Sequence, residues 1–275
     1  MQSPWSSRLR RLRTAVRWTH ASYTLLGGFL LTLFLLGYVW WPLAEEYLAY
    51  IDWDGPWWQY LDWLLLGIFF VMTLLIMGGA DLRTDWKIVL VGLAGGLAIE
   101  GWGTQTLLWS YYTQERPPLW IIPAWPIASL SIDRLVRLLQ LALPGVKPRT
   151  ERWLYWLVFG GFFGLMLIFV APTMDKSLTI ASTGLVVFLI LTPTDHRLAL
   201  LTFAAGSGLG YFLELWGTTR LCWTYYTLQT PPFFAVLAHG MAAVAFWRAL
   251  RVLERILVWR GARKRQIEVE TVTGD

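Results

Sequence analysis

The sequence predicts an all-α, polytopic integral membrane protein with about eight transmembrane helices in two parallel four-helix repeats. The chain is 56% hydrophobic and only 15% charged, whereas a soluble domain is about a quarter charged. Several apolar runs approach the roughly 20 residues that a helix needs to cross a bilayer. A long, partly aromatic stretch also occurs twice, and this recurrence predicts the two repeats.

The repeated stretch begins at a glutamate and ends at a pair of prolines. Residues 100–118 and 214–232 align without a gap at a constant offset of 114 positions, and share Glu, Trp, Gly, Thr, Leu, Trp, Tyr, Tyr, Thr, Pro and Pro. A match of this length at a fixed spacing indicates a duplication. We therefore expect a first repeat over residues 1–147, with a basic N-terminal flank, and a second over residues 148–275, with a basic C-terminal tail.

Each half contains four apolar runs of helical length. The runs of the first half lie at about 23–41, 61–79, 88–109 and 120–137. Those of the second half lie at about 153–171, 178–191, 198–217 and 233–250. An even number of spans per half makes both copies cross the membrane in the same direction, so we expect parallel repeats about an axis along the membrane normal.

The loop charges predict the orientation of the chain. The first long loop carries Glu45, Glu46, Asp52 and Asp54 and no Lys or Arg, whereas Arg and Lys gather at both ends of the chain and in alternate loops. Because basic segments stay on the cytoplasmic side, we expect both termini in the cytoplasm and the protein in the cytoplasmic (inner) membrane. The basic residues are thus explained by membrane orientation, and no nucleic-acid partner is expected.

Glu100 and Glu214, which open the two copies, are the candidate acid/base groups. Each lies inside an apolar run, where a lipid-facing carboxylate is costly, so both should point into the helix bundle. Thr104 and Thr218 follow one helical turn later on the same face, where their hydroxyls could hydrogen-bond the carboxylates. The tyrosines of the following loops complete the expected catalytic set, which is Glu100, Glu214, Thr104, Thr218, Tyr112 and Tyr226, with Tyr111 and Tyr225 beside them.

A structural interpretation of the two glutamates stays open. Each carboxylate could instead bond a neighbouring helix, or pair with an arginine such as Arg116 or Arg220. A duplicated folding device would leave the same sequence pattern as a duplicated catalytic group.

Aromatic residues crowd the ends of the helices that carry the glutamates. A binding site lined by aromatic side chains suits a polyene, quinone, sterol-like or pigment ligand, and aromatic faces stabilise cations. His239 occupies the position equivalent to Trp125 in the second copy, which marks the two halves as different. The expected ligand-binding residues are Trp102, Trp109, Trp125, Trp216, Trp223 and His239.

No cofactor or metal is expected from the sequence. The chain has one Cys and three His, and they show no zinc-ligand spacing. A D-x-x-x-D pattern at Asp81 and Asp85 is typical of magnesium–diphosphate sites in prenyl transferases, but the second half has only Asp195 at the corresponding turn.

Glu100-x-x-Gly103-Thr104, followed by Trp109-x-Tyr111-Tyr112 and a span rich in Pro and Trp, resembles the membrane-embedded carotenoid biosynthesis proteins of the carotenoid hydratase family. The resemblance covers about residues 92–137, and 206–240 in the second copy. It implies protonation of an isoprenoid double bond, or addition of water to it.

Three functions remain open from the sequence. The first is a membrane-embedded protein that binds an isoprenoid, carotenoid or other lipid, with hydratase- or cyclase-type catalysis by the two carboxylates as the enzymatic form. The second is a non-catalytic subunit of a larger respiratory or photosynthetic complex, in contact with other membrane subunits and seating lipid or pigment. The third is a proton-linked transporter. Whether the two glutamate sites share one cavity is also open.

Overall fold

The computed structural model describes residues 13–14 and 16–273. The predicted basic flank lies partly outside these residues, since Arg8, Arg10 and Arg11 precede them. The described chain is helical apart from two three-residue strands. Its elements are α2 (His20–Val39), α3 (Trp41–Leu48), η1 (Trp57–Tyr60), α4 (Trp63–Met77), α5 (Leu82–Gln105), β1 (Trp109–Tyr111), η2 (Leu119–Ile121), α6 (Ala124–Ala142), α7 (Pro148–Val170), η3 (Ala171–Thr173), α8 (Ser177–Leu191), α9 (His196–Thr219), β2 (Trp223–Tyr225) and α10 (Phe233–Thr273).

Six segments of the described chain are long and apolar enough to cross a membrane, which indicates a membrane-embedded protein. They are His20–Val39, Leu82–Gln105, Leu119–Ala142, Pro148–Thr173, His196–Thr219 and Phe233–Arg260. The two remaining apolar helices, α4 and α8, have 15 residues each. The prediction of an all-α chain with membrane-length helices is therefore confirmed, and the count of eight spans stays a prediction.

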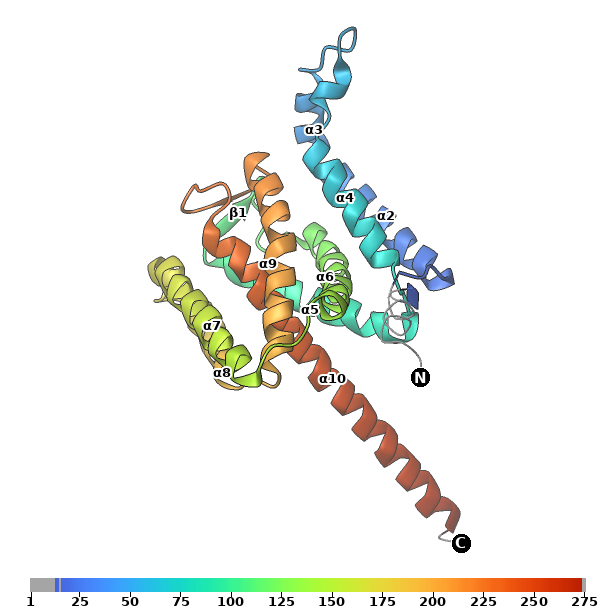
Figure 1. Cartoon of the computed structure of the whole chain (residues 1–275). Helices are drawn as coiled ribbons and strands as arrows, with labels where there is room; N and C mark the ends of the chain where they lie inside the picture. Colours follow the sequence, from blue (N-terminus) through green and yellow to red (C-terminus); the bar gives the residue numbers. More distant parts are fainter. Residues whose placement is uncertain (1–12, 15, 274–275) are drawn as a thin grey trace.

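The centre of the molecule is built from four helices that come from both halves of the chain. Helices α5 and α6 of the first half pack on α9 and α10 of the second, and α10 then runs well beyond the bundle (Figure 1). The α2–α4 hairpin lies on one side of this centre and the α7–α8 hairpin on the other (Figure 1). The hydrophobic core thus joins the two predicted repeats.

Small residues let the central helices approach closely. A Cβ atom on Gly96 of α5 would lie 2.4 Å from the Trp125 side chain of α6, and one on Gly210 of α9 would lie 2.5 Å from the His239 side chain of α10. Both contacts would be clashes, so only glycine fits at these two positions. The two glycines are 114 positions apart, as are their two partners.

A buried ion pair fastens α6 to the start of α5. The Arg134 guanidinium donates to the Asp85 carboxylate at 2.6 Å and to the Gly78 carbonyl oxygen at 2.8 Å, and both charged side chains are almost completely buried. Arg248, the equivalent of Arg134, donates to the carbonyl oxygen of Thr192, the equivalent of Gly78. In each half, therefore, an arginine donates to the carbonyl oxygen of the residue that caps the C-terminus of a short apolar helix, α4 or α8.

The two strands pair with each other, which the sequence did not predict. Strands β1 and β2 are antiparallel, with Trp109 opposite Tyr225, Ser110 opposite Thr224 and Tyr111 opposite Trp223. Ser110 and Thr224 are equivalent positions of the two copies, so the pairing is centred on a local two-fold relationship. The predicted third span was too long at its end, because α5 stops at Gln105 and the chain turns into β1.

Candidate functional site

Glu100 lies at the centre of a cluster of hydrogen-bond donors and is 3% exposed. The Trp109 indole N–H donates to Oε2 at 3.0 Å, and the Tyr111 hydroxyl donates to Oε1 at 2.8 Å. The Trp125 indole of α6 donates to Oε1 at 3.2 Å. The carboxylate thus ties the end of α5 to strand β1 and to the neighbouring helix.

Glu214 has the same surroundings with one substitution. The Trp223 indole donates to Oε2 at 2.9 Å, and the Tyr225 hydroxyl donates to Oε1 at 2.8 Å. The third partner is the Nε2 atom of His239, 2.9 Å from Oε1. The imidazole therefore takes the place of the indole that completes the first cluster, and an imidazole can act as an acid or a base whereas an indole cannot.

Two glycines allow the tryptophans of the strands to reach the carboxylates. A Cβ atom on Gly103 would lie 1.9 Å from the Trp109 ring, and one on Gly217 would lie 2.0 Å from the Trp223 ring. The chain therefore folds back over its own helix end, and the indole ring packs directly against the glycine of the last turn. This close approach gives both glycines of the repeated stretch a physical role.

The strand geometry selects Tyr111 and Tyr225 as the tyrosines of the site. Successive side chains of a strand point to opposite faces, so Trp109 and Tyr111 share the face that meets Glu100. Tyr112 points elsewhere, and its hydroxyl donates to the carbonyl oxygen of Val39. Tyr226 likewise donates to the carbonyl oxygen of Phe169 at 2.7 Å. The structure therefore does not bring Tyr112 and Tyr226 to the carboxylates, and the W-x-Y spacing was the signal that could have identified their neighbours.

Both site tyrosines are donors. Burial, together with the adjacent Glu100 carboxylate, raises the pKa of Tyr111 well above its usual value. Burial and Glu214 raise the pKa of Tyr225 in the same way. Each phenol therefore keeps its proton and holds a carboxylate oxygen in place.

The predicted contact between the threonines and the carboxylates is absent. The Thr104 hydroxyl donates to the main-chain oxygen of Glu100 at 2.5 Å, and the Thr218 hydroxyl donates to that of Glu214 at 2.5 Å. This bond within one helical turn is a common alternative for threonine in a helix. The spacing placed the threonines correctly on the face of the glutamates, but the backbone oxygen was the nearer acceptor.

Trp102 and Trp216, two predicted ligand contacts, anchor the outer hairpins instead. The Trp102 indole donates to the Thr179 hydroxyl of α8 at 3.2 Å. The Trp216 indole donates to Asp62, which caps α4, at 2.8 Å. Each tryptophan thus contacts the hairpin of the other half. Arg220, proposed as a partner of Glu214, also pairs with Asp62, at 3.0 Å.

The two clusters meet at a stacked pair of rings. Trp125 and His239 have ring centroids 5.9 Å apart and planes inclined by 17°. Their outer edges bond Glu100 and Glu214 respectively. Trp109 also contacts Tyr225, and Tyr111 contacts Trp223, with centroids 5.8 and 5.9 Å apart. The two glutamate sites are therefore parts of one aromatic and hydrogen-bonded core.

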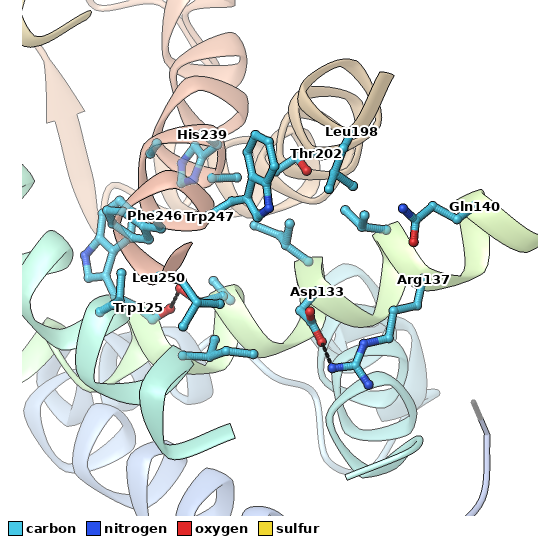
Figure 2. A pocket seen from close by; sticks show the side chains of 18 residues that line it. Trp125, Asp133, Arg137, Gln140, Leu198, Thr202, His239, Phe246, Trp247 and Leu250 are labelled. Atoms are coloured by element: carbon cyan, nitrogen blue, oxygen red, sulfur yellow. Dashed lines mark hydrogen bonds and ion pairs between the residues drawn. The ribbon is translucent and has the colours of Figure 1, made fainter. Parts of the chain in front are cut away.

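A cavity of about 260 Å³ lies directly against this stack. It is enclosed by α5, α6, α9 and α10, and its wall is mostly aliphatic and aromatic (Figure 2). Trp125 and His239 lie on one side of the cavity, and Asp133, Arg137 and Gln140 lie on the other (Figure 2). Neither carboxylate lines the cavity, so His239 is the group through which Glu214 can act on a bound molecule.

The described residues contain no group of three or more His, Cys, Asp and Glu side chains that could hold a metal ion. The D-x-x-x-D pattern does not form an open carboxylate pair, because Asp85 is fully buried against Arg134 and accepts from the backbone N–H of Asp81 at 2.9 Å. The magnesium–diphosphate interpretation therefore has no support at this position.

The fold and the site together define a helical protein with membrane-length apolar helices and a cavity beside a hydrogen-bonded His–Glu pair. No family model, curated protein or solved structure matches the chain.

Proposed function

We propose that this protein binds an isoprenoid or another lipid chain in the cavity between α5, α6, α9 and α10. His239 acts as the acid/base group, and Glu214 positions it. One observation carries the proposal: the His239 ring lines the cavity and hydrogen-bonds a buried carboxylate. A mostly apolar pocket with a few convergent polar groups is the usual form of a small-molecule site. The cavity is small for such sites, which suits one segment of a chain rather than a whole carotenoid.

The reaction supported best is protonation of an isoprenoid double bond, followed by addition of water. The His239 imidazolium transfers its proton to one alkene carbon, so a C–H bond forms and the cation is left on the other carbon. Water adds to that carbon and returns a proton to the imidazole, so no electrons are gained or lost. Aromatic faces in the wall, from Trp125, Phe246 and Trp247, suit a transient cation.

The membrane arrangement that accompanies this proposal has eight spans. Helices α4 and α8 are the short members, and the two halves are parallel repeats about an axis along the membrane normal. Both termini lie in the cytoplasm and the host membrane is the cytoplasmic (inner) membrane. The self-complementary pairing of β1 with β2 supports such an axis, because it joins equivalent residues of the two halves.

The test is to purify the protein in mild detergent and identify bound lipids and proteins by mass spectrometry. A stoichiometric isoprenoid that is lost on substitution of Ala243, a cavity residue, by Phe supports the proposal. Matched substitution of Ala205, which is buried on α9 and does not line the cavity, controls for added bulk in the core. Absence of any cavity-dependent lipid contradicts it.

A second candidate, a non-catalytic subunit of a larger membrane complex, is favoured by the segment between α2 and α4. This segment exposes several aromatic side chains, among them Trp53, Trp57 and Trp58. It also carries the acidic residues of the first loop without any Lys or Arg. Aromatic residues are enriched at protein interfaces. Stoichiometric partner subunits in the same purification, lost on deletion of residues 50–60, would favour this candidate.

A further inference from the structure

The polar end of the cavity indicates which kind of lipid it takes, and this step rests on the proposed function. Asp133 lies there between two guanidinium groups. Its Oδ2 atom accepts from Arg137 at 2.8 Å and also from Arg134, whose other contacts are with Asp85 and Gly78. Two carboxylates thus neutralise two arginines. Among the described residues that line the cavity, no basic side chain is left without a carboxylate partner.

An anionic head group would meet two penalties at this position. It would approach the Asp133 carboxylate, and it could reach Arg137 only by displacing that carboxylate. Breaking a partly buried ion pair leaves an uncompensated charge behind, which is costly. The charge arrangement therefore disfavours phosphate and diphosphate esters.

Two polar side chains of the cavity wall, Asp133 and Thr202, have an oxygen atom that no described residue bonds. No described residue donates to Asp133 Oδ1, since both arginines bond Oδ2. The Thr202 side chain lines the cavity from α9 and is only 4% exposed, yet its hydroxyl has no hydrogen-bond partner among the described residues. Figure 2 shows Thr202 and Asp133 on opposite walls of the cavity. A hydroxyl of the cavity wall that has no partner within the described chain is free to donate to a ligand or to accept from one.

We infer that the ligand is an uncharged lipid that ends in a hydroxyl group, recognised by Thr202 and the free oxygen of Asp133. The hydroxyl can donate to Asp133 Oδ1 and exchange a hydrogen bond with Thr202, since a hydroxyl is both donor and acceptor. The chain then runs along the apolar wall toward Trp125 and His239. A prenyl alcohol has this chemistry.

The experiment compares farnesol with farnesyl diphosphate, which have the same chain and different head groups. Equilibrium binding of each tritiated compound is measured to the full chain in nanodiscs, with binding to empty nanodiscs subtracted. We expect farnesol to bind at least tenfold more tightly than the diphosphate. Equal or tighter binding of the diphosphate overturns the inference and leaves the proposed function standing. Binding of neither compound counts against both.

Matched threonine variants locate the recognition. Thr202→Val removes the hydroxyl and keeps the shape, and we expect roughly a five- to tenfold loss of farnesol affinity. Thr183→Val is the control, because Thr183 on α8 is also buried without a partner and does not line the cavity. Asp133→Asn is expected to narrow the preference for farnesol over the diphosphate, because Arg137 is then free. Unchanged farnesol affinity in Thr202→Val overturns the assignment.

Discussion

Trp125 and His239 stand at equivalent positions of the two copies and stack on each other across the centre of the molecule, with ring centroids 5.9 Å apart. Each ring bonds the glutamate of its own half. The same position thus holds an indole in one half and an imidazole, which can serve as an acid or a base, in the other. The two halves share a geometry and differ in chemistry at this one contact with the carboxylates.

Replacing His239 by Trp should remove the acid/base group and keep the fold. The first copy shows that an indole fits against a glycine of the preceding helix and bonds the glutamate. We expect a melting temperature within a few degrees of the wild type and loss of isoprenoid conversion, measured by thermal unfolding and product analysis. The exchange variant, Trp125→His with His239→Trp, is the matched control, and it should recover part of the conversion beside Glu100. Full conversion by His239→Trp alone would rule out the assigned role.

Glu100→Gln should destabilise the protein because an amide cannot accept every donor of the cluster. The glutamine NH₂ group would face at least one indole N–H or phenol O–H, which leaves a buried donor unpaired at a cost of roughly 1–3 kcal/mol. Glu214→Gln should show the same loss and should also reduce conversion, since His239 loses its partner. Thermal unfolding in detergent measures both losses. Glu115→Gln is the control, because Glu115 is exposed in the loop after β1; an equal loss there would contradict the explanation.

Gly103→Ala and Gly217→Ala should displace the tryptophans that hold the carboxylates. The new methyl groups would overlap rigid rings at 1.9 and 2.0 Å, and overpacking of this kind costs typically 1–3 kcal/mol. Gly208→Ala lies on the same helix as Gly217 with nothing within 4 Å. In that position alanine should be neutral or stabilise the helix by up to about 1 kcal/mol. We expect lower melting temperatures for Gly103→Ala and Gly217→Ala than for Gly208→Ala. Equal melting temperatures for the three variants would contradict the prediction.

The junction between the α2–α4 hairpin and the bundle should weaken in acid. Burial alone would raise the pKa of Asp62, but the hydrogen bonds from Leu65, Arg220 and Trp216 outweigh it and lower the pKa below its usual value. A carboxylate with a lowered pKa contributes stability above the usual aspartate pKa of about 3.9. That contribution is lost as the pH falls through the lowered pKa. Melting temperatures of wild type and Asp62→Asn should therefore differ at neutral pH, begin to converge below about pH 4, and coincide once the pH lies below the lowered pKa. If the difference in melting temperature persists in acid, the effect of Asp62→Asn comes from packing and not from the charge of the carboxylate.

The sequence was sufficient for the helices and for the burial of the two glutamates. Apolar runs define their own helices, and an intramembrane carboxylate has to face inward, so Glu100 and Glu214 were placed correctly in the protein interior. The partners of the carboxylates depend on how the chain returns after α5 and α9. After each of these helices the chain enters a three-residue strand, and the two strands, 114 positions apart, pair with each other. No local periodicity in the sequence predicts this pairing. The choice of Tyr111 over Tyr112 followed from that pairing.

The arginine and tryptophan contacts show a second limit of the sequence. Arg134 and Asp85 both lie near predicted loops, where charged residues are expected on the surface, yet they form a buried pair. Trp102 and Trp216 were grouped with the ligand wall because they adjoin the glutamates. Their indole nitrogens instead reach the hairpin of the other half. Such contacts depend on the relative position of helices that sequence spacing does not provide.

The pairing of Ser110 with Thr224 has a consequence for how chemical asymmetry can arise. Two separate molecules of a single repeat could form the same antiparallel ladder, because its register is self-complementary. In such an assembly one gene would encode both faces of the central stack, so a change from tryptophan to histidine would occur on both sides at once. Only covalent fusion of the copies frees one side to vary. The joined chain keeps a tryptophan on one side of the stack and places a histidine on the other.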